Sequence, residues 1–347
     1  MKRKLGFLMS ILLVLSLVGY GVVKVAGKSH VLTEDKKELV IATSFYPVYI
    51  MALNLTDQVE GVRVVNLTEN QIGCVHDYQL TTKDMRVIAG ADIVILNGGE
   101  MEIFMEDVLH DYPNLKVIDA SEGMSFLEGS SHDHSAHGEE TEEDTHTHED
   151  ELTSEDEHNH ITNNSVEESH DHVHNHSAIN GHVWMNMEMY QQQIATVAAY
   201  LSEYDSENAV YYENNAKTYI DKVKALQNEY ESLKDLTSGK EVIIFHDAFA
   251  YLADELGMEV VHAVDTDSET ALSAGELAEV VEEIKLHSIQ YLFTEEQYST
   301  KIADQVSSET GAKVYVMDSL VTGESDKDTY LNGMKQNLEL LYDTFSK

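Results

Sequence analysis

Short runs of hydrophobic residues recur along the first third of this chain, and stretches with helical periodicity separate them. The runs predict strands at 39–44, 62–67, 93–96 and 115–118. The stretches between them predict helices beginning at Tyr46, from Thr81 to near Gly90, and over 101–109. Apolar strands that alternate with helices are typical of an α/β lobe built on a mainly parallel sheet.

The same alternation returns after Gly239, with strands expected at 242–245, 260–264, 291–294 and 314–317 and a last helix from about Lys327. Between the two regions, the segment "INGHVWMNMEMYQQQIATVAAYLSEYD" predicts a loop followed by a helix. Apolar residues at steps of three and four then predict a second, long helix beginning near 205–206. Its stripe is Tyr212, Ala216, Tyr219, Val223, Leu226, Tyr230 and Leu233. The pattern therefore predicts two α/β lobes with mainly parallel sheets, joined by a long rigid helix, with a cleft between them.

This organisation gives an N-terminal lobe over 38–186, a helical segment over 187–238 and a C-terminal lobe over 239–347. Within the first lobe the hydrophobic pattern collapses over 128–177, where acids and histidines dominate without one lysine or arginine. Such a segment cannot bury enough apolar surface to offset its chain entropy, so we expect a disordered loop. Its eleven histidines are His132, His134, His137, His146, His148, His158, His160, His170, His172, His174 and His176.

The N-terminus, 1–27, has three basic residues followed by an apolar run, which is the layout of an export signal. The run also approaches the length that spans a bilayer, so an uncleaved membrane anchor is the alternative. The sole cysteine, Cys74, is far from this run and cannot carry a lipid there. We expect the protein to work outside the cytoplasm, either periplasmic or anchored at the cell surface.

Charge narrows the choice of partners. The chain carries 63 acidic and 22 basic residues, a formal net charge of −41. This charge repels nucleic acids and anionic membrane surfaces and attracts cations. We therefore expect no nucleic-acid partner and a cationic ligand.

Four side chains that suit a metal follow predicted strands or lie in loops, namely His76, His182, His246 and Asp318. Three imidazoles and one carboxylate are a suitable ligand set for Zn²⁺. The sequence has no HExxH motif, no paired cysteines, no glycine-rich phosphate loop and no Gly-x-Ser-x-Gly elbow. Four protein ligands would also leave no position for an activated water, so the pattern favours binding over catalysis.

Several segments occur in the order typical of one family, including "TSFYPVY", "GHVWMN", "FHDAFAYLADELGMEV" and "VYVMDSL". The chain resembles the zinc-binding solute-binding proteins of metal ABC importers from Leu39 to its C-terminus. The resemblance implies two α/β lobes joined by a long helix, Zn²⁺ bound between the lobes as cargo, and a membrane permease and ATPase as partners. It also implies that the protein is not an enzyme, and we expect a monomer.

Position by position, the resemblance assigns the metal ligands to His76 in "VHDYQ", His182 in "GHVWM", His246 in "FHDAF" and Asp318 in "VMDSL". Manganese-selective relatives typically have glutamate at the third position, and histidine there favours zinc because imidazole suits Zn²⁺. Glu295 in "FTEEQ" is expected either to orient a ligand imidazole or to be a solvated loop carboxylate.

The chain departs from the family pattern at Asn180-Gly181, where Asp-Pro is usual, in lacking a proline after His76, and in lacking the lipid-carrying cysteine. The histidine-rich segment precedes His182 and is expected to gather zinc weakly near the tight site. Three alternatives stay open at this point: a manganese receptor of the same family, a metal-dependent surface adhesin or buffer, and a metal-dependent hydrolase.

Overall fold

The structure is a computed structural model that describes residues 38–68, 75, 78–129, 179–264, 273–295 and 300–346. The expected leader, His76 and most of the histidine-rich segment lie outside these residues. In the part of the chain that is described, no helix is both long enough and apolar enough to cross a membrane.

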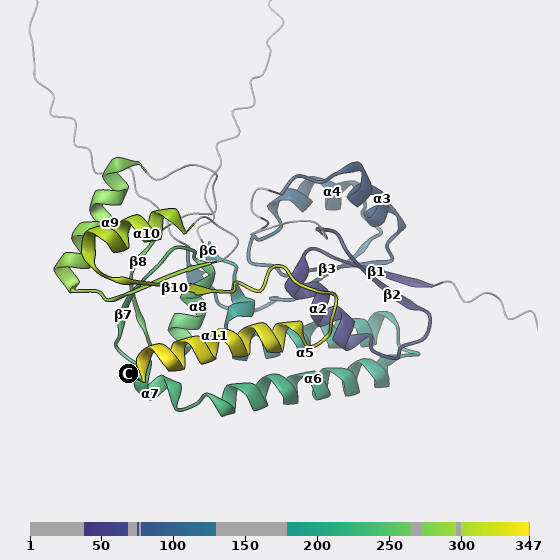
Figure 1. The fold of residues 1–347 in the computed structure, drawn as a ribbon. Helices are drawn as coiled ribbons and strands as arrows, with labels where there is room; N and C mark the ends of the chain where they lie inside the picture. The colour runs from purple at the N-terminus through teal and green to yellow at the C-terminus, as the bar shows by residue number, and fades with distance from the viewer. Residues whose placement is uncertain are drawn as a thin grey trace, which may run out of the picture.

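The first lobe is a four-stranded parallel sheet with strand order β2-β1-β3-β4 (Figure 1). Its strands are β1 (Leu39–Thr43), β2 (Val62–Asn66), β3 (Ile93–Leu96) and β4 (Lys116–Asp119). Its helices are α2 (Tyr46–Leu55), α3 (Thr82–Gly90) and α4 (Glu106–Asp111), the last entered through a 3₁₀ turn, Ile103–Met105. Thr81 begins α3 as predicted, because its hydroxyl and the Asp84 carboxylate form a reciprocal capping box.

The second lobe repeats this plan, with a parallel sheet of strand order β10-β9-β7-β8 (Figure 1). Its strands are β7 (Glu241–Ile244), β8 (Glu259–Ala263), β9 (Tyr291–Glu295) and β10 (Lys313–Met317). Its helices are α8 (Ala248–Glu255), α9 (Ala274–His287), α10 (Lys301–Thr310) and α11 (Thr329–Phe345). The prediction of two α/β lobes with mainly parallel sheets is confirmed.

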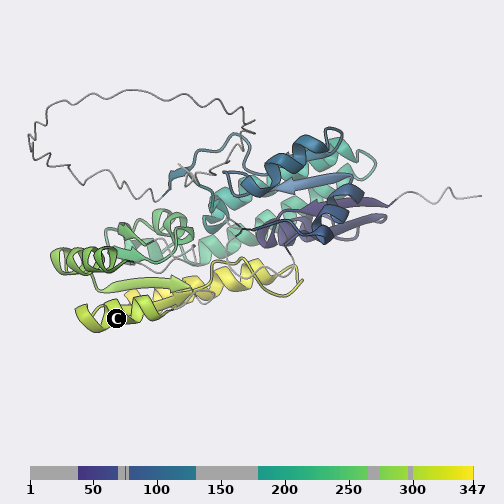
Figure 2. The same cartoon turned by 90° about the horizontal axis from the view of Figure 1, so that it is seen from above.

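The segment between the sheets contains the two successive helices that the sequence predicts, together with short elements that it does not predict. It contains a short antiparallel pair, β5 (Leu127–Glu128) and β6 (Ile179–Asn180), a 3₁₀ turn (Val183–Met185), and the helices α5 (Met187–Tyr204), α6 (Ala209–Glu229) and α7 (Leu233–Thr237). The long helix α6 packs against α2 and α5 and also against α11 of the second lobe (Figures 1 and 2). The domain boundaries at 186 and 238 stay predictions.

Helix α6 begins later than the predicted capping pair at 205–206, because Asp205 has another role. Asp205 ends α5, and its carboxylate accepts hydrogen bonds from the side chains of Asn208 (2.7 Å) and Tyr212 (2.8 Å). The helix also ends before the predicted stripe does, so Leu233 belongs to α7. The first five residues of that stripe are buried on α6, as expected.

Alternation along the strands divides the core into three parts. In β3, Ile93 and Ile95 face the inner side of the sheet and Val94 faces the outer side. In β7, Ile244 faces the inner side and Ile243 the outer side. The residues that face inward from both sheets join one continuous cluster, which we call the shared core. Val94 packs under α3 and α4, and Ile243 packs under α9 and α10, in two separate outer cores.

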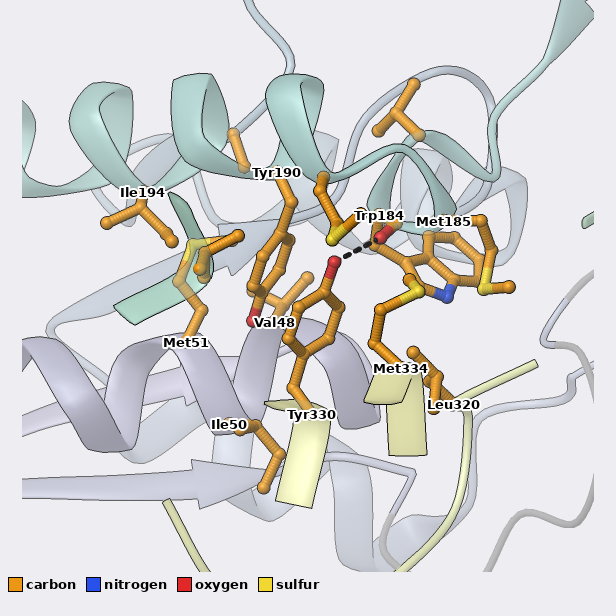
Figure 3. Close-up of a cluster of buried hydrophobic side chains, with 14 of the residues drawn as sticks. Val48, Ile50, Met51, Trp184, Met185, Tyr190, Ile194, Leu320, Tyr330 and Met334 are labelled. Atoms are coloured by element: carbon orange, nitrogen blue, oxygen red, sulfur yellow. Dashed lines mark hydrogen bonds between the residues drawn. The ribbon is translucent and has the colours of Figure 1, made fainter. Parts of the chain in front are cut away.

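The centre of the shared core lies where α2, α5 and α11 meet (Figure 3). The Tyr190 ring stacks on the Tyr330 ring, with centroids 3.9 Å apart and planes at 21°. The Tyr330 hydroxyl donates a hydrogen bond of 2.9 Å to the carbonyl oxygen of Trp184, and the Trp184 indole donates one of 2.8 Å to the carbonyl of Ser319. These two hydrogen bonds satisfy the Tyr330 hydroxyl and the Trp184 indole N–H across the junction of the lobes.

Candidate metal centre

The register of the second sheet brings His246 and Glu295 together. Strands β7 and β9 are neighbours, and Ile244 pairs with Phe293, so the residues two positions further along each strand stand side by side. Nδ1 of His246 lies 3.0 Å from Oε2 of Glu295, and both side chains are fully buried. The two atoms are close without the alignment of a hydrogen bond, so the contact is chiefly electrostatic. Glu295 is therefore a buried partner of His246 and not a solvated loop carboxylate.

His182 lies beside His246, although it comes from a different part of the chain. It follows β6, which lies between the two lobes (Figure 1), and opens the 3₁₀ turn that leads into α5. Its side chain is buried, and its ring lies edge-on to that of His246, with centroids 4.8 Å apart and planes at 86°. The structure thus brings two of the predicted metal ligands together.

Asp318 follows β10 directly, and Asn337 of α11 holds its backbone. The Asn337 amide accepts a hydrogen bond from the Asp318 N–H (2.9 Å) and donates one to the Asp318 carbonyl (2.7 Å). One carboxylate oxygen, Oδ1, accepts from the Leu320 N–H at 2.8 Å. This arrangement fixes the backbone from which the Asp318 carboxylate projects.

The full set of four ligands stays a prediction. His76 lies outside the described residues. Within the ranges that the structure describes, no three histidine, cysteine, aspartate or glutamate side chains form a group that could hold a metal ion. The role of Asp318 as a ligand beside the two histidines stays a prediction.

The buried Glu295 carboxylate and the imidazoles of His182 and His246 are groups that suit a cation. Neither carboxylate oxygen of Glu295 makes a hydrogen bond among the described residues, and the side chain is fully buried. Burying a negative charge is costly unless a positive charge balances it. A divalent cation bound to the neighbouring imidazoles would supply that balance, and imidazole nitrogens are ligands that Zn²⁺ prefers.

Two residues that support the candidate ligands were not predicted as site residues. Asn180 contacts His182, and Asn337 holds Asp318. Asn180 was noticeable in sequence only as a departure from the usual Asp-Pro. Asn337 was detectable as a polar residue on the buried stripe of α11, beside Leu338 and Leu341.

A second buried carboxylate lies in the first lobe. Glu102 accepts hydrogen bonds from the Ser44 hydroxyl (2.7 Å) and from the N–H groups of Asn97 (2.7 Å) and Gly98 (3.1 Å). Burial raises the pKa of Glu102 to about 7, although these three donors lower it in part. The Asn97 side chain donates in turn to the carbonyl of Gly181, at 2.9 Å, directly before His182. Glu102 thus supports the segment that carries His182.

The chain is similar to known proteins over most of its length. Residues 41–344 match the family model described as ZnuA, zinc-uptake complex component A, periplasmic. The high-affinity zinc uptake system protein ZnuA of Bacillus subtilis (strain 168) is 29% identical over 313 residues, covering 88% of each chain. The zinc-binding protein AdcA of Streptococcus pyogenes serotype M3 is 27% identical over 98% of this chain, which spans 61% of the length of AdcA.

Solved structures show the same fold. The solute-binding protein FpvC of P. aeruginosa in complex with Ni²⁺ has a TM-score of 0.69 at 20% identity, with coverage of 89% of this chain and 97% of FpvC. A crystal structure of ZnuA has a TM-score of 0.63 at 22% identity, with coverage of 87% and 98%. Because the family model covers most of the sequence, the chain belongs to the zinc-uptake complex component A (ZnuA) family.

Proposed function

We propose that this chain is an exported receptor that binds Zn²⁺ and delivers it to the permease and ATPase of a metal ABC importer. Membership of the zinc-uptake family supports this function, and so do the names of the B. subtilis and S. pyogenes relatives. The structural observation that carries the proposal is the buried pair of imidazoles, His182 and His246, 4.8 Å apart beside the carboxylate of Glu295. The ion is cargo, and we expect no catalysed reaction.

The proposed ligands are His76, His182, His246 and Asp318. His182 is carried by the segment between the lobes, whereas His246 and Asp318 follow strands of the second sheet. We expect Zn²⁺ to be bound by His76 and Asp318 together with the two imidazoles, with a modest closure of the lobes. Four ligands would complete a tetrahedral shell.

Glu295 is proposed to orient His246. An ionised carboxylate attracts a proton electrostatically, so the proton of a neutral His246 ring is favoured on Nδ1, the nitrogen 3.0 Å from Oε2 of Glu295. Nε2 of His246 would then carry the lone pair for the metal. Such outer partners both orient a ligand and raise its basicity.

The histidine pair also bears on the choice of metal. A manganese receptor would be expected to use more oxygen ligands, whereas a histidine at position 246 adds a nitrogen ligand. The histidine-rich segment lies outside the described residues, and its proposed role is to hold zinc weakly close to the tight site. For the N-terminal apolar run we keep two alternatives, a cleaved export signal and a retained membrane anchor; both place the receptor outside the cytoplasm.

The test compares two histidine substitutions by competition titration with a zinc chelator. His246→Ala removes one of four ligands and should weaken zinc binding by more than the roughly 100-fold that loss of an outer partner costs. His174→Ala, the matched control, removes one of many equivalent histidines and should leave the tight site unchanged. Equal effects of the two substitutions would contradict the assignment, as would purified protein without bound zinc and without zinc affinity.

A further inference from the structure

Asn180 uses every polar group of its side chain and its carbonyl at the junction of the two lobes. Its amide oxygen Oδ1 accepts a hydrogen bond from the backbone N–H of His182 at 3.0 Å and lies 2.8 Å from Nδ1 of the His182 ring. Its amide nitrogen donates to the carbonyl of Asp247 at 2.8 Å, directly after His246. Its own carbonyl accepts from the Tyr251 hydroxyl at 2.6 Å. The residue is buried.

These contacts fix which way the Asn180 amide points. The backbone N–H of His182 can only donate, so it requires an oxygen opposite, and the carbonyl of Asp247 can only accept, so it requires the NH₂ group. A flipped amide would place its NH₂ group against the His182 N–H and its oxygen against the Asp247 carbonyl oxygen, so both buried hydrogen bonds would be lost. Oδ1 must therefore be the atom that faces Nδ1 of His182.

The amide orientation in turn fixes the tautomer of His182. Oδ1 has no hydrogen to give, so the 2.8 Å contact is a hydrogen bond only if Nδ1 carries the proton. In a neutral ring the other nitrogen then carries the lone pair. We infer that Asn180 is a positioning residue that holds His182 in the Nδ1–H tautomer before any ion arrives, so that Nε2 is the metal-binding atom. This inference rests on the proposed function only for its consequence for zinc.

An amide suits this position better than a carboxylate. An aspartate at 180 would keep an acceptor facing Nδ1 of His182, but its second oxygen would meet the carbonyl oxygen of Asp247 without a proton between them. Asn180 therefore serves both ligand-bearing segments: it orients His182 and fastens the backbone that follows His246. The side chain that departs from the family pattern is the one that makes both contacts.

The test reads the tautomer in metal-free protein. Nitrogen-15 chemical shifts of labelled histidines distinguish a protonated ring nitrogen from one with a lone pair, and the His182 signals are assigned by their loss in His182→Gln. At about pH 8, above the usual histidine pKa near 6.5, the wild-type ring should show a protonated Nδ1 and an unprotonated Nε2. A wild-type His182 that carries its proton on Nε2 would overturn the inference, whether or not any variant folds.

Three variants separate orientation of the ring from general support. Asn180→Ala should move the His182 signals toward the Nε2–H form and weaken zinc binding by roughly 10- to 100-fold. Asn180→Asp should restore the Nδ1–H signature, and Tyr251→Phe, which removes a different hydrogen bond to the same residue, should leave it unchanged. An unaltered tautomer in Asn180→Ala would mean that Asn180 is merely structural.

The outcome for zinc is separable from the outcome for the tautomer. If metal-free His182 has the expected tautomer but His182→Gln binds zinc as tightly as the wild type, the ligand assignment fails and the tautomer inference stands. If His182→Gln loses zinc while the wild-type tautomer is Nε2–H, the proposed function stands and the inference fails.

Discussion

At the scale of single residues, Glu102 makes the stability of the fold depend on pH. Its pKa is raised from 4.5 to about 7, chiefly by burial, with a contribution from the nearby charge of Asp119. Between these values the folded protein holds a proton that the unfolded chain releases. The free energy of unfolding therefore falls as pH rises through this window and receives no further change from Glu102 above it.

Glu102→Gln should remove this dependence. The wild type, relative to the variant, should lose about 3 kcal/mol of unfolding free energy between pH 4.5 and 7.5. Urea unfolding of metal-free protein at several pH values measures the difference. Glu106→Gln, an exposed change of carboxylate to amide in α4, is the control. Parallel profiles for the wild type and Glu102→Gln would show that the buried carboxyl does not titrate as argued.

Residue-level prediction from sequence succeeded where strand ends determine the position. His246 and Asp318 follow their strands as expected, and the structure adds that the sheet register places Glu295 against His246. The contacts of Asn180 could not be predicted, because they join 180, 182 and 247 through a junction of lobes that no local pattern describes. The position of His76 stays a prediction.

At the scale of elements, Tyr330 joins α11 both to α5, through the Tyr190 ring, and to the 3₁₀ turn before α5, through the carbonyl of Trp184. Tyr330→Phe keeps the stacking on Tyr190 and removes the donor to the buried carbonyl of Trp184. We expect the variant to lose about 1–3 kcal/mol of unfolding free energy, because a buried acceptor loses its partner. Tyr211→Phe, on the exposed face of α6, is the matched control and should change stability little. Equal stabilities of the two variants in urea would refute this role.

Elements were predictable where the local pattern is strong. The eight sheet strands lie within one or two residues of the predicted positions, because each is a compact apolar run between turn residues. The long helix was placed less well. Asp205 is a good capping residue by type, but its carboxylate accepts hydrogen bonds from the side chains of Asn208 and Tyr212 instead. These bonds depend on the packing of α5 against α6, which the local sequence pattern does not describe. The pair β5 and β6 was missed because each strand has two residues.

At the scale of the whole molecule, the pairing of β5 with β6 shows how the histidine-rich segment can be removed. Leu127 pairs with Asn180 and Glu128 with Ile179, so the chain leaves and returns at adjacent points. Deleting 131–176 would leave Gly129, Ser130, Ser177 and Ala178 between the strands, a common length for a hairpin loop.

We expect this deletion variant to keep one tightly bound zinc per chain and to lose the weaker sites, because the proposed ligands lie outside the deleted segment. Calorimetric zinc titration of the variant beside the full chain measures both classes of site. Loss of the tight site, with the fold intact by circular dichroism, would show that the segment supplies a ligand.

The division of the core constrains how this protein can change over evolution. Side chains under α3 and α4, or under α9 and α10, pack only within their own lobe, so either outer layer can be exchanged with that of a relative as a unit. The shared core allows no such exchange, since Met51 of α2, Tyr190 of α5 and Met334 of α11 fill one space (Figure 3). A chimera that takes its two sheets from different parents must inherit these three helices together, and substitutions on them should covary across the lobes.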